Sequence, residues 1–397
     1  MQKTEKNIII SDRILRLIKR MEQAGEDAYL VGGSLRDLLL GLSPNDYDLA
    51  TSALPQKTVE IFADHRVITT GLKHGTVTVM EDAEPIEITT FRIDGLYSDA
   101  RHPDGVTFTG RIEEDLARRD FTINAMAYHP KIGLIDPFGG REDLEKKILR
   151  AVGNPEVRFD EDALRILRAF RFSAQLGFAI EEKTLAGCTE SKYGLTKIAK
   201  ERIAVELLKL LLSKEPTLSL QKMIETGVSF FVFGEYLPSN KLLELLPQMT
   251  ATDTGKLGFF FSECDEEEAR KILEMLRYSK KQITGALAVA RGATKKISTP
   301  LEARRLIALC GSYAEDACRA SILWENSPKE ALDWVKESKA PTKISDLKIS
   351  GRDLMALGYA GREIGLILEE LLRLVIDDPT QNEKAKLLEL TKNISIN

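Results

Sequence analysis

The spacing of apolar residues changes once along this chain, at Gly153-Asn154-Pro155, and this change limits the fold more than any other feature. Before it, β-branched runs such as "GTVTVM" and "PIEITTFRI" have strand character, and helical segments such as "SDRILRLIKRMEQAG" lie between them. From residue 160 to 397 the spacing is almost wholly helical and is broken only by short turns. The sequence therefore predicts an α+β head, with a small mixed sheet and helices, followed by an all-α remainder.

Composition narrows the class of protein. A chain of 397 residues is too long for one ordinary core, and 43% hydrophobic and 29% charged residues are typical of a soluble globular protein. The four cysteines have no disulfide or zinc spacing and no apolar stretch could span a bilayer, so we expect buried thiols and a cytoplasmic protein. All four histidines lie in the first third, which excludes a histidine-built metal-hydrolase domain further along. The net charge of −5 argues only weakly against a nucleic-acid partner, because a local basic face is the relevant test.

The segment "VGGSLRDLLLGLSPNDYDLAT", residues 31–51, is the most informative stretch. Gly32 and Gly33 follow an expected strand and precede an expected helix, so backbone N–H groups there could face a phosphate. The segment has neither the GxGxxG nor the Walker A pattern, and a plain tight turn explains the two glycines equally well.

Two carboxylates follow in the same segment. If Asp46-Tyr47-Asp48 lies on a strand, Asp46 and Asp48 project from one face, where a cation between them relieves their repulsion. Such oxygen ligands suit Mg²⁺, and Glu87 in "IEITTFR" could join from a neighbouring strand to complete a two-metal site. The alternatives are an exposed turn for the aspartates and an ordinary outward-facing strand residue for Glu87.

Five segments in order resemble the polymerase-beta-like nucleotidyltransferases, specifically the family of class II tRNA nucleotidyltransferases and bacterial poly(A) polymerases. The first is "GGSLRD…LLG…DYDLAT". The others resemble the ribose and triphosphate motif, the hinge between head and neck, the base-selecting helix and the helix that braces it: "RRDFTINAMA" (118–127), "DPFGGREDL" (136–144), "EDALRILRAFRF" (161–172) and "KERIAVELLKLL" (200–211). The resemblance covers residues 1–215. The division that we expect is a catalytic nucleotidyltransferase head (1–150), a base-selecting helical neck (151–215), a helical body (216–330) and a tRNA-binding helical tail (331–397).

The resemblance also implies roles for individual residues. Asp46 and Asp48 would hold two Mg²⁺ ions, which activate the RNA 3′-hydroxyl and stabilise the leaving pyrophosphate. The residues implied to bind the rest of the nucleotide are Gly32, Gly33, Arg36 and Arg119 at the phosphates, and Asp120 and Asn124 at the ribose 2′-hydroxyl. Without the resemblance, Arg118-Arg119-Asp120 would be an exposed charge cluster and Asp37 would pair with a neighbouring arginine.

Base choice rests on the start of the base-selecting helix. As plain helix chemistry, Glu161 and Asp162 would lie in a first helical turn, and each would form an ion pair with Arg165. As a base reader, Asp162 accepts from the amino group of cytosine or adenine and Arg165 donates to the adjacent ring nitrogen, whereas uracil and guanine make both contacts repulsive. Glu161 would hold Arg165 in place, so C and A are selected without a nucleic-acid template. Arg168 is grouped with these nucleotide-binding residues, although a phosphate-facing role and a solvated role fit both Arg168 and Arg171 equally well.

Two further segments bear on which member of the family this is. "FRIDGLYSDARHPDGVTF" (91–108) resembles the flexible loop that complete enzymes need for the final A, and as an alternative it is a plain surface loop. The candidate residues in it are Arg92, Asp94, Tyr97, Asp99 and Arg101. Residues 345–375 resemble the C-terminal domain of Gram-positive tRNA nucleotidyltransferases, which favours a tRNA substrate, and as an alternative they are a plain helical pair.

The sequence thus predicts template-independent addition of CCA to the 3′ end of tRNA, with CTP and ATP as substrates and Mg²⁺ as the cofactor. The alternatives are an A-adding tRNA nucleotidyltransferase or a poly(A) polymerase and, from another class, a catalytically inactive tRNA-binding protein. Retention of both Asp46 and Asp48 argues against an inactive protein. No membrane partner is expected, and no oligomeric state follows from the sequence.

Overall fold

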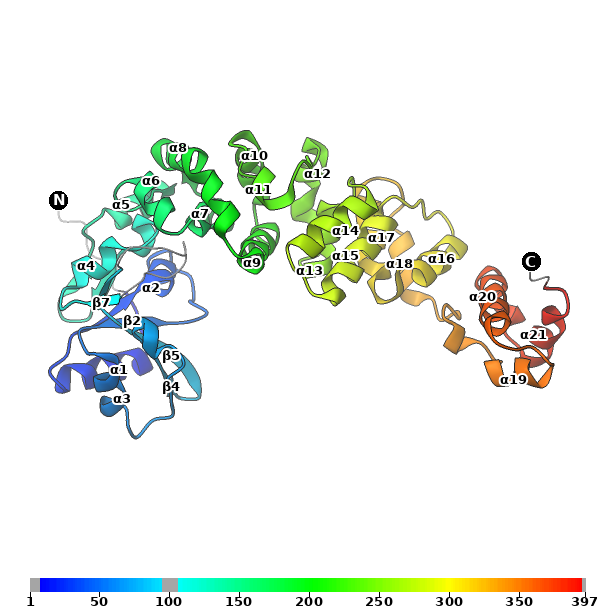
Figure 1. Ribbon diagram of the computed structural model, residues 1–397, viewed down its shortest axis with the longest axis horizontal. Helices are drawn as coiled ribbons and strands as arrows, with labels where there is room; N and C mark the ends of the chain where they lie inside the picture. Colours follow the sequence, from blue (N-terminus) through cyan, green and yellow to red (C-terminus); the bar gives the residue numbers. More distant parts are fainter. Residues whose placement is uncertain (1–7, 95–105, 395–397) are drawn as a thin grey trace. The chain divides into compact units, whose positions relative to one another are not determined.

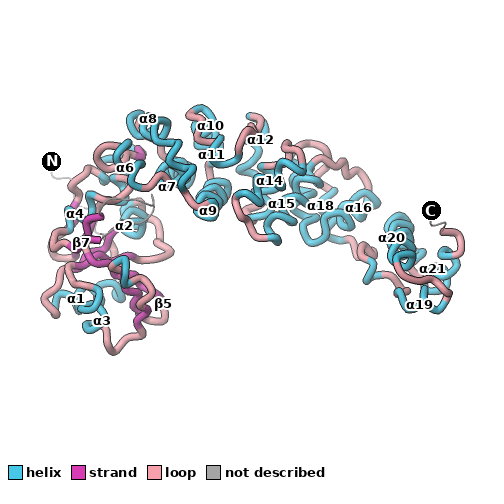
Figure 2. Tube along the Cα trace, viewed as in Figure 1, coloured by secondary structure: helices cyan, strands magenta, loops and turns pink. Residues whose placement is uncertain are grey.

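The computed structural model describes residues 8–94 and 106–394. The chain divides into two compact units, Met1–Glu206 with Leu218–Val232, and Leu207–Thr217 with Phe233–Asn397. Within the described residues the strands all belong to the first unit, while the second is built of helices (Figure 1, Figure 2). The predicted fold class, a mixed-sheet head followed by a helical region, is confirmed.

The first unit contains all of the described strands and the helices between them. Its strands are β1 (Ala28–Val31), β2 (Asp48–Thr51), β3 (Val67–Ile68), β4 (Thr76–Glu81), β5 (Glu84–Thr90), β6 (Arg92–Asp94), β7 (Val106–Phe108), β8 (Ala127–His129), β9 (Gly133–Ile135), β10 (Ile148–Leu149) and β11 (Ala179–Ile180). Its helices are α1 (Asp12–Gln23), α2 (Gly32–Leu39), α3 (Pro55–Ile61), α4 (Ile112–Ala117), α5 (Gly140–Lys146), α6 (Pro155–Glu161), α7 (Leu164–Leu176) and α8 (Glu182–Glu190), with the 3₁₀ turns η2 (Thr122–Asn124) and η3 (Ser191–Lys197). Residues of both units make up α9 (Lys200–Leu211), α10 (Pro216–Glu225) and α11 (Phe230–Phe233).

The head is organised around one mixed sheet. Seven of the described strands form it in the order β3-β4-β5-β2-β1-β8-β9. The pair β2–β5 is parallel and the other neighbours are antiparallel. Strand β1 is buried along its whole length, as expected for a strand inside a sheet. The parallel pair sets Asp48 opposite Glu87, so two of the three predicted carboxylates lie side by side in the sheet.

Two local expectations need correction. The run "PIEITTFRI" forms two strands, because the chain leaves the main sheet at Phe91, whose ring is fully buried, and β6 pairs with β7 instead. A short strand, β11, lies in the part expected to be wholly helical. It pairs in parallel with β10 and so joins the end of the head to the segment before α8.

The second unit is a series of packed helices. They are α12 (Asn240–Leu245), α13 (Asp253–Phe260), α14 (Glu266–Met275), α15 (Lys280–Ala293), α16 (Pro300–Cys310), α17 (Ala314–Leu323), α18 (Ala331–Glu337), α19 (Gly351–Ala356), α20 (Arg362–Asp377) and α21 (Lys384–Thr391). One core cluster includes Leu306 and Ala317, and another, built from α19 to α21, includes Leu354 and Leu371. All four cysteines are free thiols. No helix in the described part of the chain is both long and apolar enough to cross a membrane.

Close packing of α13 against α15 gives a stability prediction. A Cβ atom at Gly258 would lie 2.5 Å from both Ala286 O and Val289 Cβ. Gly258→Ala should therefore lower the free energy of unfolding by about 2 kcal/mol, because an overpacked core must shift. Gly365→Ala is the matched control: this α20 glycine has no neighbour within 4 Å, so alanine should stabilise the protein by roughly 0.5 kcal/mol. Urea denaturation followed by circular dichroism measures both changes, and equal stability of the two variants would contradict the packing argument.

Candidate active site

The glycine turn after β1 brings backbone N–H groups next to a carboxylate and a guanidinium. Gly32 opens α2 with a φ of +73°, a conformation that favours glycine. A Cβ atom there would lie 3.1 Å from Arg119 Nη1 and 3.5 Å from Asp48 Oδ2. Gly33 follows in the first turn of the same helix, where unpaired N–H groups attract anions. This turn can bind a phosphate that also contacts Arg119.

Asp48 lies beside this turn, but the three predicted acidic residues are not all on strands as predicted. Asp48 begins β2 opposite Glu87 of β5, whereas Asp46 lies in an exposed bend before the strand. The bend after Pro44 prevents Asp46 from sharing the regular alternation of β2. Burial, together with the negative charges of Asp46 and Glu87, raises the pKa of Asp48 to about 6, and the positive charge of Arg119 opposes this rise.

The carboxylates of Asp46, Asp48 and Glu87 are chemically suitable ligands for a divalent cation. Among residues 8–94 and 106–394, no three His, Cys, Asp or Glu side chains converge as a ready-made metal site. The donor set is nevertheless all carboxylate oxygen, the type that Mg²⁺ prefers, and Mg²⁺ commonly takes only one or two protein carboxylates together with substrate phosphates. Because neighbouring negative charge disfavours ionisation of Asp48, a cation at Asp46 and Asp48 would relieve that repulsion.

A chain of hydrogen bonds joins the residues predicted to bind phosphate and ribose. Arg36 Nη1 donates to Asn124 Oδ1 at 2.9 Å, and Asn124 Nδ2 donates to Asp120 Oδ1 at 3.0 Å. Arg36 also forms the expected ion pair with Asp37, at 2.7 Å. Arg168 Nε donates to Asp120 Oδ2 at 2.8 Å. The structure therefore places these residues in one network, in which Arg36 is buried and already hydrogen-bonded.

Asp120 remains ionised in this network. Burial works against its charge, but the charge of Arg168, hydrogen bonds from Asn124 and Arg168, and the charge of Arg165 together hold the pKa of Asp120 below its usual range. Its carboxylate is thus a fixed acceptor beside η2.

The base-selecting segment differs from the continuous helix that was expected. Helix α6 ends at Glu161 and α7 begins at Leu164, so Glu161 and Asp162 do not lie in one first helical turn. Asp162 is extended, with φ −144° and ψ 100°, and its Oδ1 accepts a hydrogen bond from Leu164 N at 3.0 Å. The side chain of Asp162 caps the backbone at the start of α7, which separates the two helices.

Arg165 is held by three hydrogen bonds. Its Nη1 donates to Glu161 Oε2 at 2.6 Å and to Arg158 O at 3.0 Å, and its Nη2 donates to Arg118 O at 3.0 Å. A guanidinium has five N–H donors, so Nε–H and one Nη2–H remain for a ligand. The predicted Glu161–Arg165 pair is present, and Glu161 fixes the orientation of Arg165 as expected.

The predicted ion pair between Asp162 and Arg165 is wrong. Asp162 Oδ2 instead accepts from Arg202 Nη2 of α9 at 2.8 Å. Asp162 Oδ1 is occupied by the bond from Leu164 N, and the hydrogen bond between Asp162 and Arg165 is a backbone one, from Arg165 N to Asp162 O. Arg202 lies in the segment that resembles the helix bracing the base-selecting helix. Its ion pair with Asp162 is a direct contact between these two segments.

The two arginines without a clear role in the sequence have specific partners. Arg168 pairs with Asp120 as described, and Arg171 Nε donates to Glu206 Oε2 at 2.5 Å in a buried ion pair. The guanidinium carbons of Arg36, Arg168 and Arg171 lie 5.1, 5.1 and 3.7 Å from the centre of the Phe172 ring. Cation–π attraction therefore helps to fix these arginines, so a merely solvated role does not fit them.

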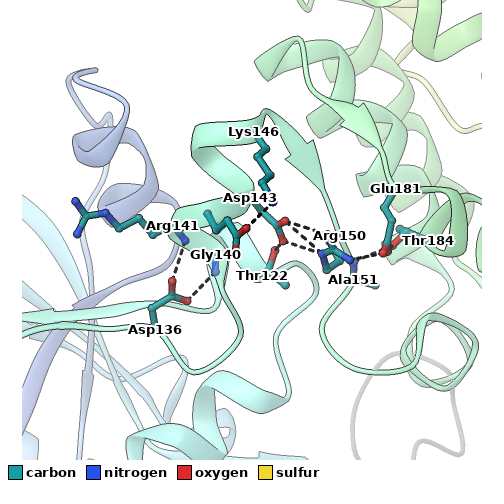
Figure 3. Close-up of polar contacts among 11 residues, drawn as sticks. Thr122, Asp136, Gly140, Arg141, Asp143, Lys146, Arg150, Ala151, Glu181 and Thr184 are labelled. Carbon is teal, nitrogen blue, oxygen red and sulfur yellow. Dashed lines mark hydrogen bonds and ion pairs between the residues drawn. The ribbon is translucent and has the colours of Figure 1, made fainter. Parts of the chain in front are cut away.

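The predicted hinge segment is tied to the ribose motif and to β11 (Figure 3). The carboxylate of Asp136 accepts from Gly140 N and Arg141 N, at 2.7 and 2.9 Å, at the start of α5. Asp143 accepts from Thr122 Oγ1 at 2.7 Å and pairs with Arg150, which also pairs with Glu181 after β11. These contacts connect η2, α5 and the start of α8.

The loop expected to assist the final A is described only at its base. Arg92 and Asp94 belong to β6, which pairs with β7. Tyr97, Asp99 and Arg101 lie outside the described residues.

Sequence reasoning missed several side chains that hold the site together. Asp115 is buried and pairs with Arg118 at 2.8 Å and Arg119 at 3.2 Å. Its spacing of three and four residues from these arginines was the available signal. The partners on α9, Arg202 and Glu206, had no such signal, because their contacts depend on how α9 packs against α7.

Fold and site together define a nucleotidyltransferase with a head of the poly(A) polymerase type. Residues 28–150 match the family model described as "Poly A polymerase head domain", and residues 256–391 match that of tRNA nucleotidyltransferase domain 2. Residues 177–238 match the model described as "Probable RNA and SrmB-binding site of polymerase A".

Relatives over the whole chain define the family more narrowly. The CCA-adding enzyme of Leuconostoc mesenteroides is 35% identical over 387 residues, which cover 95% of this chain and 94% of that enzyme. The CCA-adding enzyme of Pediococcus pentosaceus is 37% identical over 380 residues, covering 94% and 95%. The chain belongs to the family of CCA-adding enzymes.

Solved structures agree with this assignment. The CCA-adding enzyme of Bacillus stearothermophilus in complex with CTP has a TM-score of 0.82 and 31% identity, covering 96% of this chain and 98% of that one. The Thermotoga maritima CCA-adding enzyme complexed with tRNA has a TM-score of 0.67 and 26% identity, with 97% of each chain covered.

The raised pKa of Asp48 predicts how the stability of the metal-free protein depends on pH. Its folded-state pKa of about 6 lies above the ordinary value near 3.8, so the folded state binds the proton more tightly and stability is lost as pH rises from about 4 to 6. Asp48→Asn cannot ionise, and above pH 6 it should be more stable than the natural protein by about 2 kcal/mol, an advantage that disappears near pH 4.

Chemical unfolding in a chelator at several pH values measures this difference, with Glu60→Gln, at an exposed side chain of α3, as the control. Addition of Mg²⁺ at neutral pH should stabilise the natural protein more than Asp48→Asn. A stability difference that does not change with pH would contradict the assignment of the pKa shift to Asp48.

Proposed function

We propose that this protein adds CCA to the 3′ end of tRNA from CTP and ATP, without a nucleic-acid template. One observation carries the proposal: Arg165 donates to Arg118 O and Arg168 donates to Asp120, so the base-selecting helix is bonded directly to the ribose and phosphate motif. A nucleotide held by its phosphates at Gly32 and Arg119 would therefore present its base to a fixed reader. Relatives whose structures contain CTP, ATP and tRNA support the same substrates.

The residues of this chain would act on the nucleotide in three places. The amides of Gly32 and Gly33 and the guanidinium of Arg119 would bind the triphosphate. Arg36 would orient Asn124 through the hydrogen bond that it donates to Asn124 Oδ1. Asp120 and Asn124 would hydrogen-bond the ribose 2′-hydroxyl, which favours ribonucleotides. The free edge of Arg165 would donate to the ring nitrogen, while Asp162 accepts from the amino group of cytosine or adenine.

Two Mg²⁺ ions, held by Asp46 and Asp48 with Glu87 nearby, would supply positive charge for the attacking RNA 3′-hydroxyl and the leaving pyrophosphate. Glu87 is exposed opposite Asp48 and would accept a hydrogen bond from ligands at that position. Asp48 would be ionised under these conditions, because bound cations reverse the repulsion that raises its pKa.

We also propose the division into a head (1–150), a neck (151–215), a body (216–330) and a tRNA-binding tail (331–397), and a cytoplasmic location. Support for a functional boundary near residue 150 comes from the head-domain match, which ends there. The second domain match, at 256–391, spans parts of the proposed body and tail.

Nucleotide incorporation into defined tRNAs tests the reaction. The substrates end at the discriminator base, after the first C or after the second C, and are incubated with CTP, ATP or both. We expect C on the first two and a single A on the third, and no incorporation by Asp46→Ala, which removes a proposed metal ligand. Addition of A alone would support an A-adding enzyme, and long A tails would support a poly(A) polymerase; either result would overturn the CCA proposal.

Substitution of Asp162 tests base selection. Asp162→Asn replaces an acceptor-only group with an amide that also donates, so discrimination of C and A against U and G should fall by about tenfold or more. Competitive incorporation from mixed nucleotides measures this ratio. Arg202→Lys keeps a cation beside Asp162 and serves as the control, with selectivity close to that of the natural protein. Unchanged discrimination in Asp162→Asn would show that another group reads the amino edge.

A further inference from the structure

An exposed aromatic surface lies next to the turn that contains Asp162. It consists of Tyr193 of η3, which is 68% exposed, Phe230 of α11, which is 56% exposed, and half-buried Phe231 between them. The Phe231 ring meets Tyr193 at a centroid distance of 5.4 Å and Phe230 at 5.6 Å, both edge to face. Large exposed aromatic groups of this kind mark interaction sites in soluble proteins.

The backbone beneath the aromatic surface is fixed. Lys192 Nζ donates to Thr226 O at 3.1 Å, which ties η3 to the chain just after α10. Val228 and Val232, on either side of the two phenylalanines, are fully buried. A ligand would therefore meet preorganised rings, and little ordering would be required on binding.

The aromatic surface adjoins the base-selecting site. A Cβ atom at Gly194 would lie 2.8 Å from Ala163 Cβ, so η3 packs directly against the residue that follows Asp162. Any molecule seated on Tyr193 is thus close to the turn that we propose reads the incoming base.

Local charge favours a polyanion at this position. Residues 191–200 contain Lys192, Lys197 and Lys200 and no acid, Glu190 and Glu201 flank this segment, and the whole chain carries a net charge of −5. Lys197 is exposed, and none of the three lysines has a carboxylate partner within the described residues. A contact surface for a second copy of this acidic chain would not require this excess of positive charge.

We propose that Tyr193, Phe230 and Phe231 stack against unpaired bases at the 3′ end of the RNA substrate, while Lys197 and Lys200 contact its phosphates. This inference rests on the proposed function, since it requires an RNA substrate. Aromatic faces stack on any base, and unpaired nucleotides are the part of an RNA whose faces are free. The surface would hold the RNA end near the nucleotide without reading its sequence, and the match of residues 177–238 to an RNA-binding family model agrees with this role.

The experiment compares binding and turnover with a tRNA transcript that lacks CCA. Tyr193→Ala and Phe230→Ala should each weaken tRNA binding, measured by fluorescence anisotropy, by about tenfold. The KM for tRNA should rise in parallel, and the KM for CTP should not change. Tyr193→Phe should bind like the natural protein, whereas Tyr193→Leu should bind like the alanine variant, because leucine keeps apolar area but cannot stack. Ile132→Ala, at a residue 62% exposed beside β8, is the control for loss of an exposed apolar group.

Salt dependence tests the lysines separately. Lys197→Gln should reduce the slope of log affinity against log salt by about 0.7, the value for one phosphate contact with a single strand. An unchanged slope would remove Lys197 from the surface.

The outcomes separate this inference from the proposed function. Unchanged tRNA affinity and KM in both alanine variants, with normal CCA addition, would overturn the stacking surface and leave the function intact. Weaker tRNA binding by the variants, in a protein that adds no CCA, would overturn the function and keep the surface. If Tyr193→Leu binds tRNA normally and sedimentation shows a dimer that only the alanine variants lose, the surface is a contact between two copies and the proposal is wrong.

Discussion

The buried carboxylate of Asp120 links three segments that carry residues proposed to bind the nucleotide. It accepts hydrogen bonds from Asn124 and Arg168, and Asn124 is held in turn by Arg36. Three separate segments, α2, η2 and α7, thus meet at one negative charge. A buried charge is costly unless it is paired, so Asn124 and Arg168 keep Asp120 ionised while Arg36 orients Asn124. Residues proposed to contact the phosphate and the ribose are therefore positioned together with α7.

Asp48 and Asp120 lie in the same unit but have opposite electrostatic environments. The pKa of Asp48 is raised to about 6 by burial and by the charges of Asp46 and Glu87, whereas arginines and Asn124 hold the pKa of Asp120 below its usual range. Asp120 already has its positive charge from the protein and needs no external cation. Asp48 lacks enough positive charge nearby, since Arg119 only partly offsets its two acidic neighbours. This difference supports the proposal of cation binding at the Asp46–Asp48 end of the site and of nucleoside contacts at the Asp120 end.

How far the sequence predicts this structure depends on the range of each interaction. The strand, glycine turn and helix at Gly32, the sheet of the head and the helical second unit follow from local spacing, and the structure has them. The Glu161–Arg165 pair was also predictable, because it lies within four residues. The break between α6 and α7 could not be predicted, because the helical spacing of apolar residues continues through Asp162. The interruption comes from the Asp162 side chain, which accepts a hydrogen bond from Leu164 N.

Ion pairs between residues far apart in the sequence could not be predicted from local spacing. Arg202 could be placed on a bracing helix by resemblance, but its contact with Asp162 joins residues forty positions apart and depends on how α9 packs. The same holds for Arg171 with Glu206 and Arg168 with Asp120, two arginines that the sequence left between a phosphate-facing and a solvated role. Charged residues on a helix have many candidate partners in sequence, and only tertiary packing selects among them.

The base reader is restricted by the chemistry of its two side chains as well as by their positions. An ionised aspartate can only accept and an arginine can only donate, so neither can adapt to uracil or guanine by turning over, as an amide side chain could. Arg165 is further fixed by three bonds, which leave one edge for a ligand. Cytosine and adenine present the same donor and acceptor order to this pair. In the proposed role, Asp162 and Arg165 would therefore not distinguish C from A by hydrogen bonding. Under the proposed function, the order C, C, A would then depend on features other than these two hydrogen bonds, because a purine and a pyrimidine differ in size where their hydrogen-bonding edges agree.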